Sequence, residues 1–136
     1  MNKTFSLIAI AVASWCFVTS PAPASDKAPA AVQAEFASFI SRFNAALKAN
    51  DPAAIAGMSK LPFQGDAAIG DADSFTAAIY KEEFTASNRA CIRRGHAVYS
   101  RDGDNNDTYA FFCGQTIYTF TRTPGGFLFT DIDTND

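Results

Sequence analysis

The sequence predicts an α+β fold in which three N-terminal helices pack on a curved antiparallel sheet of three to four strands. Two observations lead to this prediction. From about residue 31 to residue 85, apolar side chains recur at helical spacing, whereas β-branched and aromatic residues dominate from residue 90 to the end. Helices that precede a run of short strands are typical of a sheet that is covered on one face.

The first predicted helix covers residues 31–50, "AVQAEFASFISRFNAALKAN". Its apolar residues recur every three or four positions and so form one stripe, which consists of Val32, Phe36, Phe39, Ile40, Phe43 and Leu47. A short second helix is expected from Pro52, because Asp51 can cap it and proline at the first helical position sacrifices no hydrogen bond. Its buried edge would be Ile55, Met58 and Leu61.

The rest of the chain divides into an irregular stretch, a third helix and strands. Proline and glycines in "LPFQGDAAIGDAD" indicate turns. Asp73 or Ser74 can then cap a third helix, "SFTAAIYKEEFT". Three segments have the composition of strands, namely residues 90–100, 108–121 and 125–132. The sequence "TPGG" before the last strand is suited to a hairpin turn.

Residues 1–24 have the three-part pattern of a secretory signal peptide. Lys3 precedes an apolar core, and Ala22 and Ala24 form a small-x-small cleavage pattern that puts the mature start at Ser25. The apolar core is shorter than the roughly 20 residues needed to span a bilayer. We therefore expect an exported protein, periplasmic or secreted, whose residues 25–136 form a single α+β domain.

Two further features of the sequence bear on export and on partners, namely Cys16 and the net charge. A lipoprotein anchor on Cys16 is the competing interpretation, but Trp15 stands where that signal requires a small residue. Of 11 basic and 14 acidic residues, only Lys3 is removed with residues 1–24, so the net charge moves from −3 to −4. With few and scattered basic residues, neither a nucleic acid nor an anionic membrane surface is an expected partner.

The two cysteines that remain, Cys91 and Cys113, predict a disulfide, because an even pair in an oxidising compartment is usually bridged. Two buried free thiols are the alternative. Such a bridge would stabilise the fold by about 3 kcal/mol according to the chain-entropy model.

The acidic stretch "RDGDNNDTYAFFC", residues 101–113, has the composition of a hairpin bend. As an EF-hand it lacks the glycine at the sixth position and the glutamate at the twelfth, so no metal site is expected. Two registers remain open. A tight loop pairs Ser100 with Asp104 and sets the cysteines opposite each other, whereas a wider loop pairs Tyr99 with Tyr109. With the wider loop, the two cysteines can be bridged only if the strand contains a bulge or if Cys91 lies ahead of the strand.

Several motifs together resemble the nuclear-transport-factor-2-like superfamily. Phe39, Phe43, Ala46, Leu47 and Asp51 match its first helix and the start of its second, and Gly126, Phe127, Phe129 and Ile132 match its terminal hairpin. The resemblance implies a cone-shaped fold with a pocket between helices and sheet. Members often pair through the open face of the sheet, so it also implies a homodimer as one arrangement. It carries over no catalytic residue and no cofactor, because the fold hosts enzymes and binding modules alike.

Four residues are the candidate ligand-binding set: Arg94, His96, Tyr118 and Asp131. Arg94 and His96 would share one face of a strand, with Tyr118 further along it and Asp131 near a pocket mouth. A solvated outer face is the plainer interpretation. The sequence thus predicts a non-catalytic exported domain that binds a small apolar or amphipathic ligand or a protein partner. The alternative is an isomerase or dehydratase with His96 or a pocket aspartate as general base.

Overall fold

The computed structural model describes residues 27–136. The predicted signal peptide and its cleavage site lie outside the described residues. Within residues 27–136, no helix combines the length and the apolar character that crossing a membrane requires.

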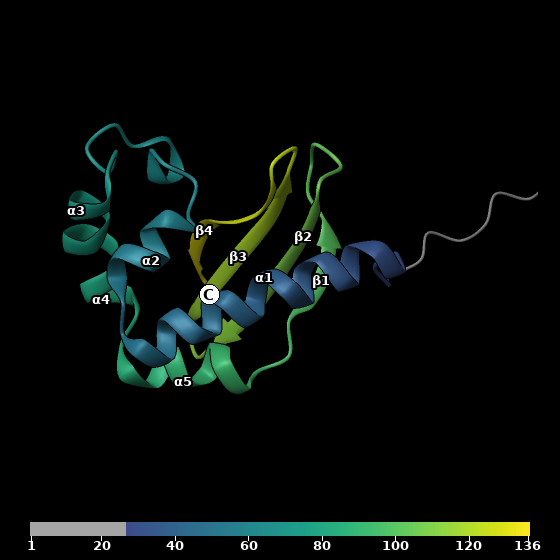
Figure 1. Ribbon diagram of the computed structural model, residues 1–136, viewed down its shortest axis with the longest axis horizontal. Helices are drawn as coiled ribbons and strands as arrows, with labels where there is room; N and C mark the ends of the chain where they lie inside the picture. Colours follow the sequence, from purple (N-terminus) through teal and green to yellow (C-terminus); the bar gives the residue numbers. More distant parts are fainter. Residues whose placement is uncertain (1–26) are drawn as a thin grey trace, which may run out of the picture.

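The described chain is an α+β fold, as predicted, with helices packed against an antiparallel sheet (Figure 1). Four strands lie in the sheet in chain order: β1 (Val98–Arg101), β2 (Asp107–Cys113), β3 (Thr116–Thr123) and β4 (Gly126–Thr134). Helix α1 (Ala30–Ala49) crosses in front of the sheet, and the shorter helices gather around its C-terminal half.

The first two helices begin where the sequence predicts them, but the second ends at Gly57, before Met58 and Leu61 of its predicted buried edge. Five of the six stripe residues of α1 are buried, and Ile40 is packed against the core at its margin. Helix α2 (Pro52–Gly57) begins with proline, and the Asp51 carboxylate accepts a hydrogen bond from the Ala54 amide at 3.1 Å. The segment after α2 lies along β4, because the Lys60 amide donates to the Phe129 carbonyl and the Phe129 amide donates to the Met58 carbonyl, both at 2.9 Å.

The third helical region begins and ends two residues earlier than predicted, at Ala72 and Glu83. After a 3-10 turn, η1 (Phe63–Gly65), three consecutive segments continue one another: α3 (Ala72–Phe75), the π-helical η2 (Thr76–Tyr80) and α4 (Lys81–Glu83). The N-cap is Asp71 and not Asp73 or Ser74. Ser74 at the third helical position completes a capping box with Asp71, with a hydrogen bond in each direction.

The predicted strand at residues 90–100 is wrong over most of its length. Residues Ala86–Arg94 form helix α5, and only Val98–Arg101 are extended. Thr85 caps α5 by accepting from the Asn88 amide at 3.2 Å, and two arginines stand in the last turn, where they complement the helix dipole. The next residue is Gly95. A side chain at this position would place its Cβ only 2.7 Å from the Cys91 carbonyl oxygen, which is too close.

The hairpins settle the register. The segment predicted as one strand, residues 108–121, is two strands joined at Gly114, which adopts φ +64°. At the first hairpin Tyr99 pairs with Tyr109 and Arg101 with Asp107, so the wider loop is confirmed and the pairing of Ser100 with Asp104 is wrong. The wider loop wins because it buries Tyr109 and Phe111 on the inner face of the sheet.

The disulfide between Cys91 and Cys113 is present, with Cα atoms 5.9 Å apart. The disulfide is compatible with the wider loop because Cys91 lies on α5, ahead of β1. The position of Cys91 is therefore not set by the pairing of β1 with β2. The bridge ties α5 to the end of β2.

The core lies between α1 and the inner face of the sheet and is built from aromatic rings. Phe43 meets the Phe120 ring edge-on at 4.9 Å, and Phe129 stacks on Phe63 at 5.1 Å. The largest fully buried side chains are Tyr118, Phe43, Phe63, Phe75, Phe84, Phe120, Phe129, Leu47, Ile55 and Ile92. These rings fill the space that the resemblance assigns to a central pocket.

Candidate functional site

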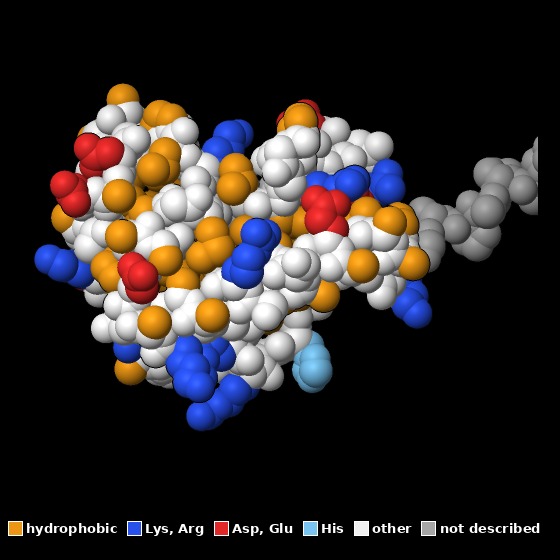
Figure 2. Space-filling view, in the orientation of Figure 1, with side chains coloured by type: hydrophobic (Ala, Val, Ile, Leu, Met, Phe, Trp, Pro, Cys, Tyr) orange, Lys and Arg blue, Asp and Glu red, His pale blue; other side chains and the backbone are white. Residues whose placement is uncertain are grey.

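The four predicted binding residues do not converge. Arg94 ends α5 and His96 lies in the loop that follows, and both are exposed. The prediction that Arg94 and His96 share one face of a strand is wrong, because both residues precede β1, which begins only at Val98. Figure 2 shows Lys and Arg side chains gathered over α5, with the histidine beside them at the surface.

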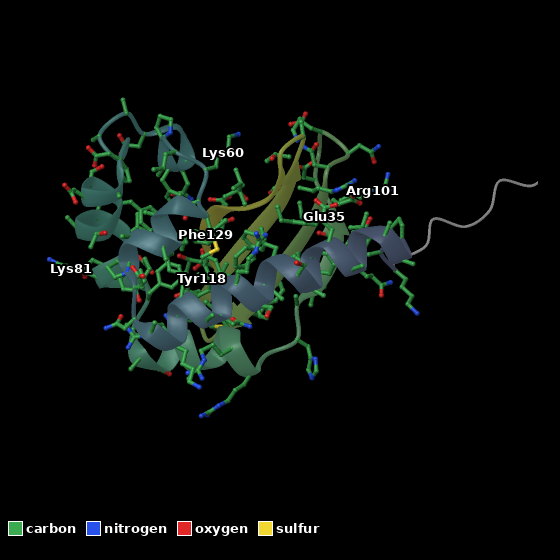
Figure 3. All side chains as sticks on the ribbon, in the orientation of Figure 1. Glu35, Lys60, Lys81, Arg101, Tyr118 and Phe129 are labelled. Carbon is green, nitrogen blue, oxygen red and sulfur yellow. A yellow bond between two sulfur atoms is a disulfide. The ribbon has the colours of Figure 1, made fainter. Side chains whose placement is uncertain are left out.

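Tyr118 lies in the interior behind α1, as Figure 3 shows. Its side chain is fully buried and its hydroxyl donates to the Glu83 carbonyl at the end of α4. Burial raises the pKa of Tyr118 far above its usual range, so the phenol stays protonated at any physiological pH. Its contacts are those of a core residue that satisfies a helix C-terminus.

Asp131 faces the outer side of the sheet because of a bulge in β4. The register shifts between Thr119 and Phe120, so that Thr119 pairs with Asp131 while Phe120 pairs with Phe129. Thr130 is the extra residue, and the alternation of β4 is inverted after it. As a result Ile132 takes the inward place opposite Tyr118, and Asp131 accepts from the Gln64 amide at the edge.

An apolar cleft of about 490 Å³ lies between α1 and the β1 side of the sheet. Phe36 and Tyr109 stack with ring centroids 3.9 Å apart and form its floor, because both line the cleft while remaining buried. The remaining lining consists of Lys27, Ala28, Gln33, Ala37, Ile40, Ala97 and Tyr99. Its volume falls within the range of small-molecule sites, about 300–1,000 Å³.

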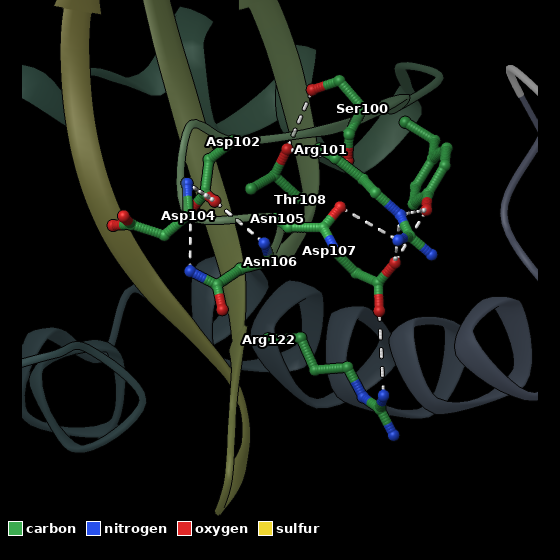
Figure 4. Close-up of polar contacts among 10 residues, drawn as sticks. Ser100, Arg101, Asp102, Asp104, Asn105, Asn106, Asp107, Thr108 and Arg122 are labelled. Atoms are coloured by element: carbon green, nitrogen blue, oxygen red, sulfur yellow. Dashed lines mark hydrogen bonds and ion pairs between the residues drawn. The ribbon is translucent and has the colours of Figure 1, made fainter. Parts of the chain in front are cut away.

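Tyr99, which lines this cleft, belongs to a polar network whose residues Figure 4 shows. The Tyr99 hydroxyl donates to Asp107 Oδ1 at 2.7 Å and accepts from Arg101 Nε at 3.2 Å. Asp107 Oδ2 also lies 3.7 Å from Arg122 Nη1, and Arg122 Nε bonds to Glu35 of α1 at 2.8 Å. The hydrogen bond with Tyr99, followed by the charge of Asp107, raises the pKa of Arg101. The network thus fixes the orientation of the Tyr99 hydroxyl beside the apolar floor.

The acidic hairpin tip is organised by its own backbone. Asp102 Oδ1 accepts from the Asp104 and Asn106 amides at 3.0 and 2.8 Å, and Asp102 Oδ2 accepts from the Asn106 side chain at 3.0 Å. These bonds, the Asn106 side chain first, lower the pKa of Asp102. Among residues 27–136, no group of three or more His, Cys, Asp or Glu is placed to hold a metal ion.

A second hollow, of about 550 Å³, lies on the outer face of the sheet between the two hairpin tips. Threonines form its floor, and they bond to one another or to the backbone: Thr121 to Thr130 at 2.8 Å, and Thr130 to the Thr119 carbonyl at 3.2 Å. The hydroxyls of Thr121 and Thr130 are therefore already paired within the sheet.

Sequence reasoning missed the residues that shape the cleft. Phe36 was correctly placed on the inner stripe of α1, but Ala97 and Tyr99 line the cleft at the start of β1, and that strand was predicted to begin too early. The pairing of Tyr99 with Tyr109 in the wider register was the one signal that could have pointed to this place.

No family model, no curated protein and no solved structure matches the chain. The fold and the site therefore carry the functional argument alone.

Proposed function

We propose that the protein is an exported, non-catalytic binding domain with a nuclear-transport-factor-2-like fold, and that the cleft between α1 and β1 takes a small apolar or amphipathic ligand. The observation that carries this proposal is the apolar cleft itself, with a stacked pair of rings as its floor and the Tyr99 hydroxyl at one end. Such a combination of apolar lining and few polar groups is typical of ligand sites.

The proposed fold is supported by the arrangement of elements. A long first helix crosses the inner face of a four-stranded meander, and the segment after α2 adds a parallel bridge from Ser59 to Phe129 at the β4 edge. Export is supported by the disulfide, because bridged cysteines persist in oxidising compartments.

The non-catalytic part of the proposal is supported by the positions of the acid–base candidates. His96, the one imidazole in the sequence, is exposed on a loop, and Tyr118 is held protonated in the core. A general base needs a hydrogen-bonding position next to a bound substrate, and neither residue lines the cleft.

The proposal can be tested by a substitution on α1 that fills the cleft with a larger side chain. We expect the fluorescent amphipathic probe anilinonaphthalene sulfonate to bind the folded protein, and the exposed Ala37→Trp variant to bind it at least about tenfold more weakly because the indole occupies the cleft. Ala45→Trp, also exposed on α1 but outside the cleft lining, is the matched control and should retain the affinity. Equal affinity in both variants would show that the cleft is not the binding site.

A further inference from the structure

Strand β1 is an edge strand with one open side. Within residues 27–136 its only strand partner is β2, so its far edge has no ladder. An unpaired edge presents backbone donors and acceptors to any further strand. The cleft hollows the inner side of this edge, where Ala97 and Tyr99 line it.

The hydrogen-bond pattern shows which backbone amides and carbonyls of β1 point to its open side. The Asp102 amide donates to the Asn106 carbonyl at 3.1 Å, which continues the β1–β2 register by one position. In an antiparallel pair, hydrogen-bonded positions alternate, so Ser100 and Val98 bond to β2. The amides and carbonyls of Tyr99 and Arg101 therefore point to the open side.

The two ends of this edge carry opposite charge. Arg94 and His96 precede β1, and Asp102 and Asp104 follow it, all of them exposed. Within the described chain, the side chains of Arg94, His96 and Asp104 have neither a hydrogen-bond nor an ion-pair partner. A strand with a basic start and an acidic end is complementary to itself when it is reversed.

We propose that β1 pairs antiparallel with β1 of a second copy of this chain, which joins the two sheets edge to edge. The outward groups meet when Tyr99 of each copy lies opposite Arg101 of the other, and Ser100 then lies opposite Ser100 at the two-fold axis. In this register His96 of one copy lies beside Asp104 of the other, twice by symmetry. This inference does not depend on the ligand cleft.

The interface is short. Two hydrogen-bonded residue pairs give about four backbone hydrogen bonds, well below the area of a standard stable complex. The dimer is therefore weak and concentration-dependent, and trapping it is the appropriate test.

The first experiment is a cysteine trap. Residues directly opposite at a non-hydrogen-bonded position have Cα atoms about 4.5 Å apart, which a disulfide can bridge. We expect Ser100→Cys, expressed from the full chain and equilibrated in a glutathione buffer that preserves the native bridge, to become a covalent dimer. Ser38→Cys, exposed on α1, is the control and should remain monomeric. A Ser100→Cys protein that stays monomeric at millimolar concentration overturns the proposal.

The second experiment reverses charge without touching the strand. His96→Glu places two negative charges together in a homodimer, and Asp104→Lys removes the carboxylate that faces His96, so each should lower the dimer fraction in sedimentation equilibrium at least about fivefold. Mixing the two variants should restore dimers, because the introduced glutamate of one copy then meets the introduced lysine of the other, while the original histidine and aspartate meet at the second contact. No recovery on mixing contradicts the pairing.

A dimer through the outer face of the sheet is the competing arrangement. It would cover Phe112 of β2, which is 51% exposed and lies beyond the part of β2 that pairs with β1. If Phe112→Asp abolishes association while the charge reversals leave it unchanged, the outer face and not the edge is the interface.

Discussion

The inner face of the sheet is closed over β3 and β4 but open over β1. Phe120 and Phe129 are fully buried between α1 and the shorter helices, whereas Tyr99 of β1 is only partly buried and lines a cleft. Both regions are aromatic, so composition does not distinguish them. What differs is the number of layers: helices surround the rings of β3 and β4, while β1 lies at the sheet margin beneath the first turns of α1 alone (Figure 1).

The largest expected effect comes from the closed region. Phe129→Ala removes a fully buried ring that is surrounded by other aromatic side chains, and it should cost about 3–5 kcal/mol in the free energy of unfolding. Urea denaturation measures it. The same substitution at the half-exposed Phe112 should cost less than about 1 kcal/mol. Similar losses at both sites would mean that the interior is less closed than the geometry indicates.

The next effect concerns the link between the regions. The bridge from Cys91 to Cys113 closes a loop of 22 residues that includes α5's end and all of β1. Replacing both cysteines with alanine should lower the free energy of unfolding by about 3 kcal/mol, because the unfolded chain regains loop entropy. An unchanged denaturation midpoint would show that α5 and β2 hold this loop without the bridge.

The smallest effect lies at the open end. The pKa of Asp102 is lowered below its ordinary 3.8 in the folded protein, so its ionised form favours folding. That contribution is complete above the ordinary pKa and is lost as the pH falls through the lowered value. Denaturation curves at pH 7 and pH 3 should therefore converge slightly in Asp102→Asn. Asp104→Asn is the control, since the Asp104 side chain accepts no hydrogen bond within the described chain. A larger convergence in the control would place the effect elsewhere.

The helices with strong local signals were predictable. The stripe of α1 and the cap formed by Asp51 depend on residues a few positions apart, and the structure confirms both. The disulfide was also predictable, because it followed from the parity of the cysteines and not from the register. In each case the deciding interaction is local or simple to count.

The wrong predictions have one physical origin. The local sequence there has only a weak preference for helix or strand, and tertiary packing decides the structure. Helix α5 has a threonine cap and terminal arginines, but the aromatic and β-branched residues that follow it closely favour a strand. The bulge at Thr130 has no sequence signature, yet it turns Asp131 outward and Ile132 inward. The cleft could not be predicted because its lining comes from α1 and from residues 97–109, which only tertiary packing brings together.

The contacts between Met58–Lys60 and Phe129 bear on the order of folding. The sheet is a meander whose hairpins join neighbours in the chain, so it can form through short loops. The bond from Lys60 to Phe129 instead closes about 70 residues and costs more chain entropy. We expect the hairpins to form in the folding transition state. The segment Met58–Lys60, here called the strap, should dock onto β4 later. Met58→Ala should therefore change mainly the unfolding rate, and an equal slowing of folding in stopped-flow measurements would place the strap in the nucleus.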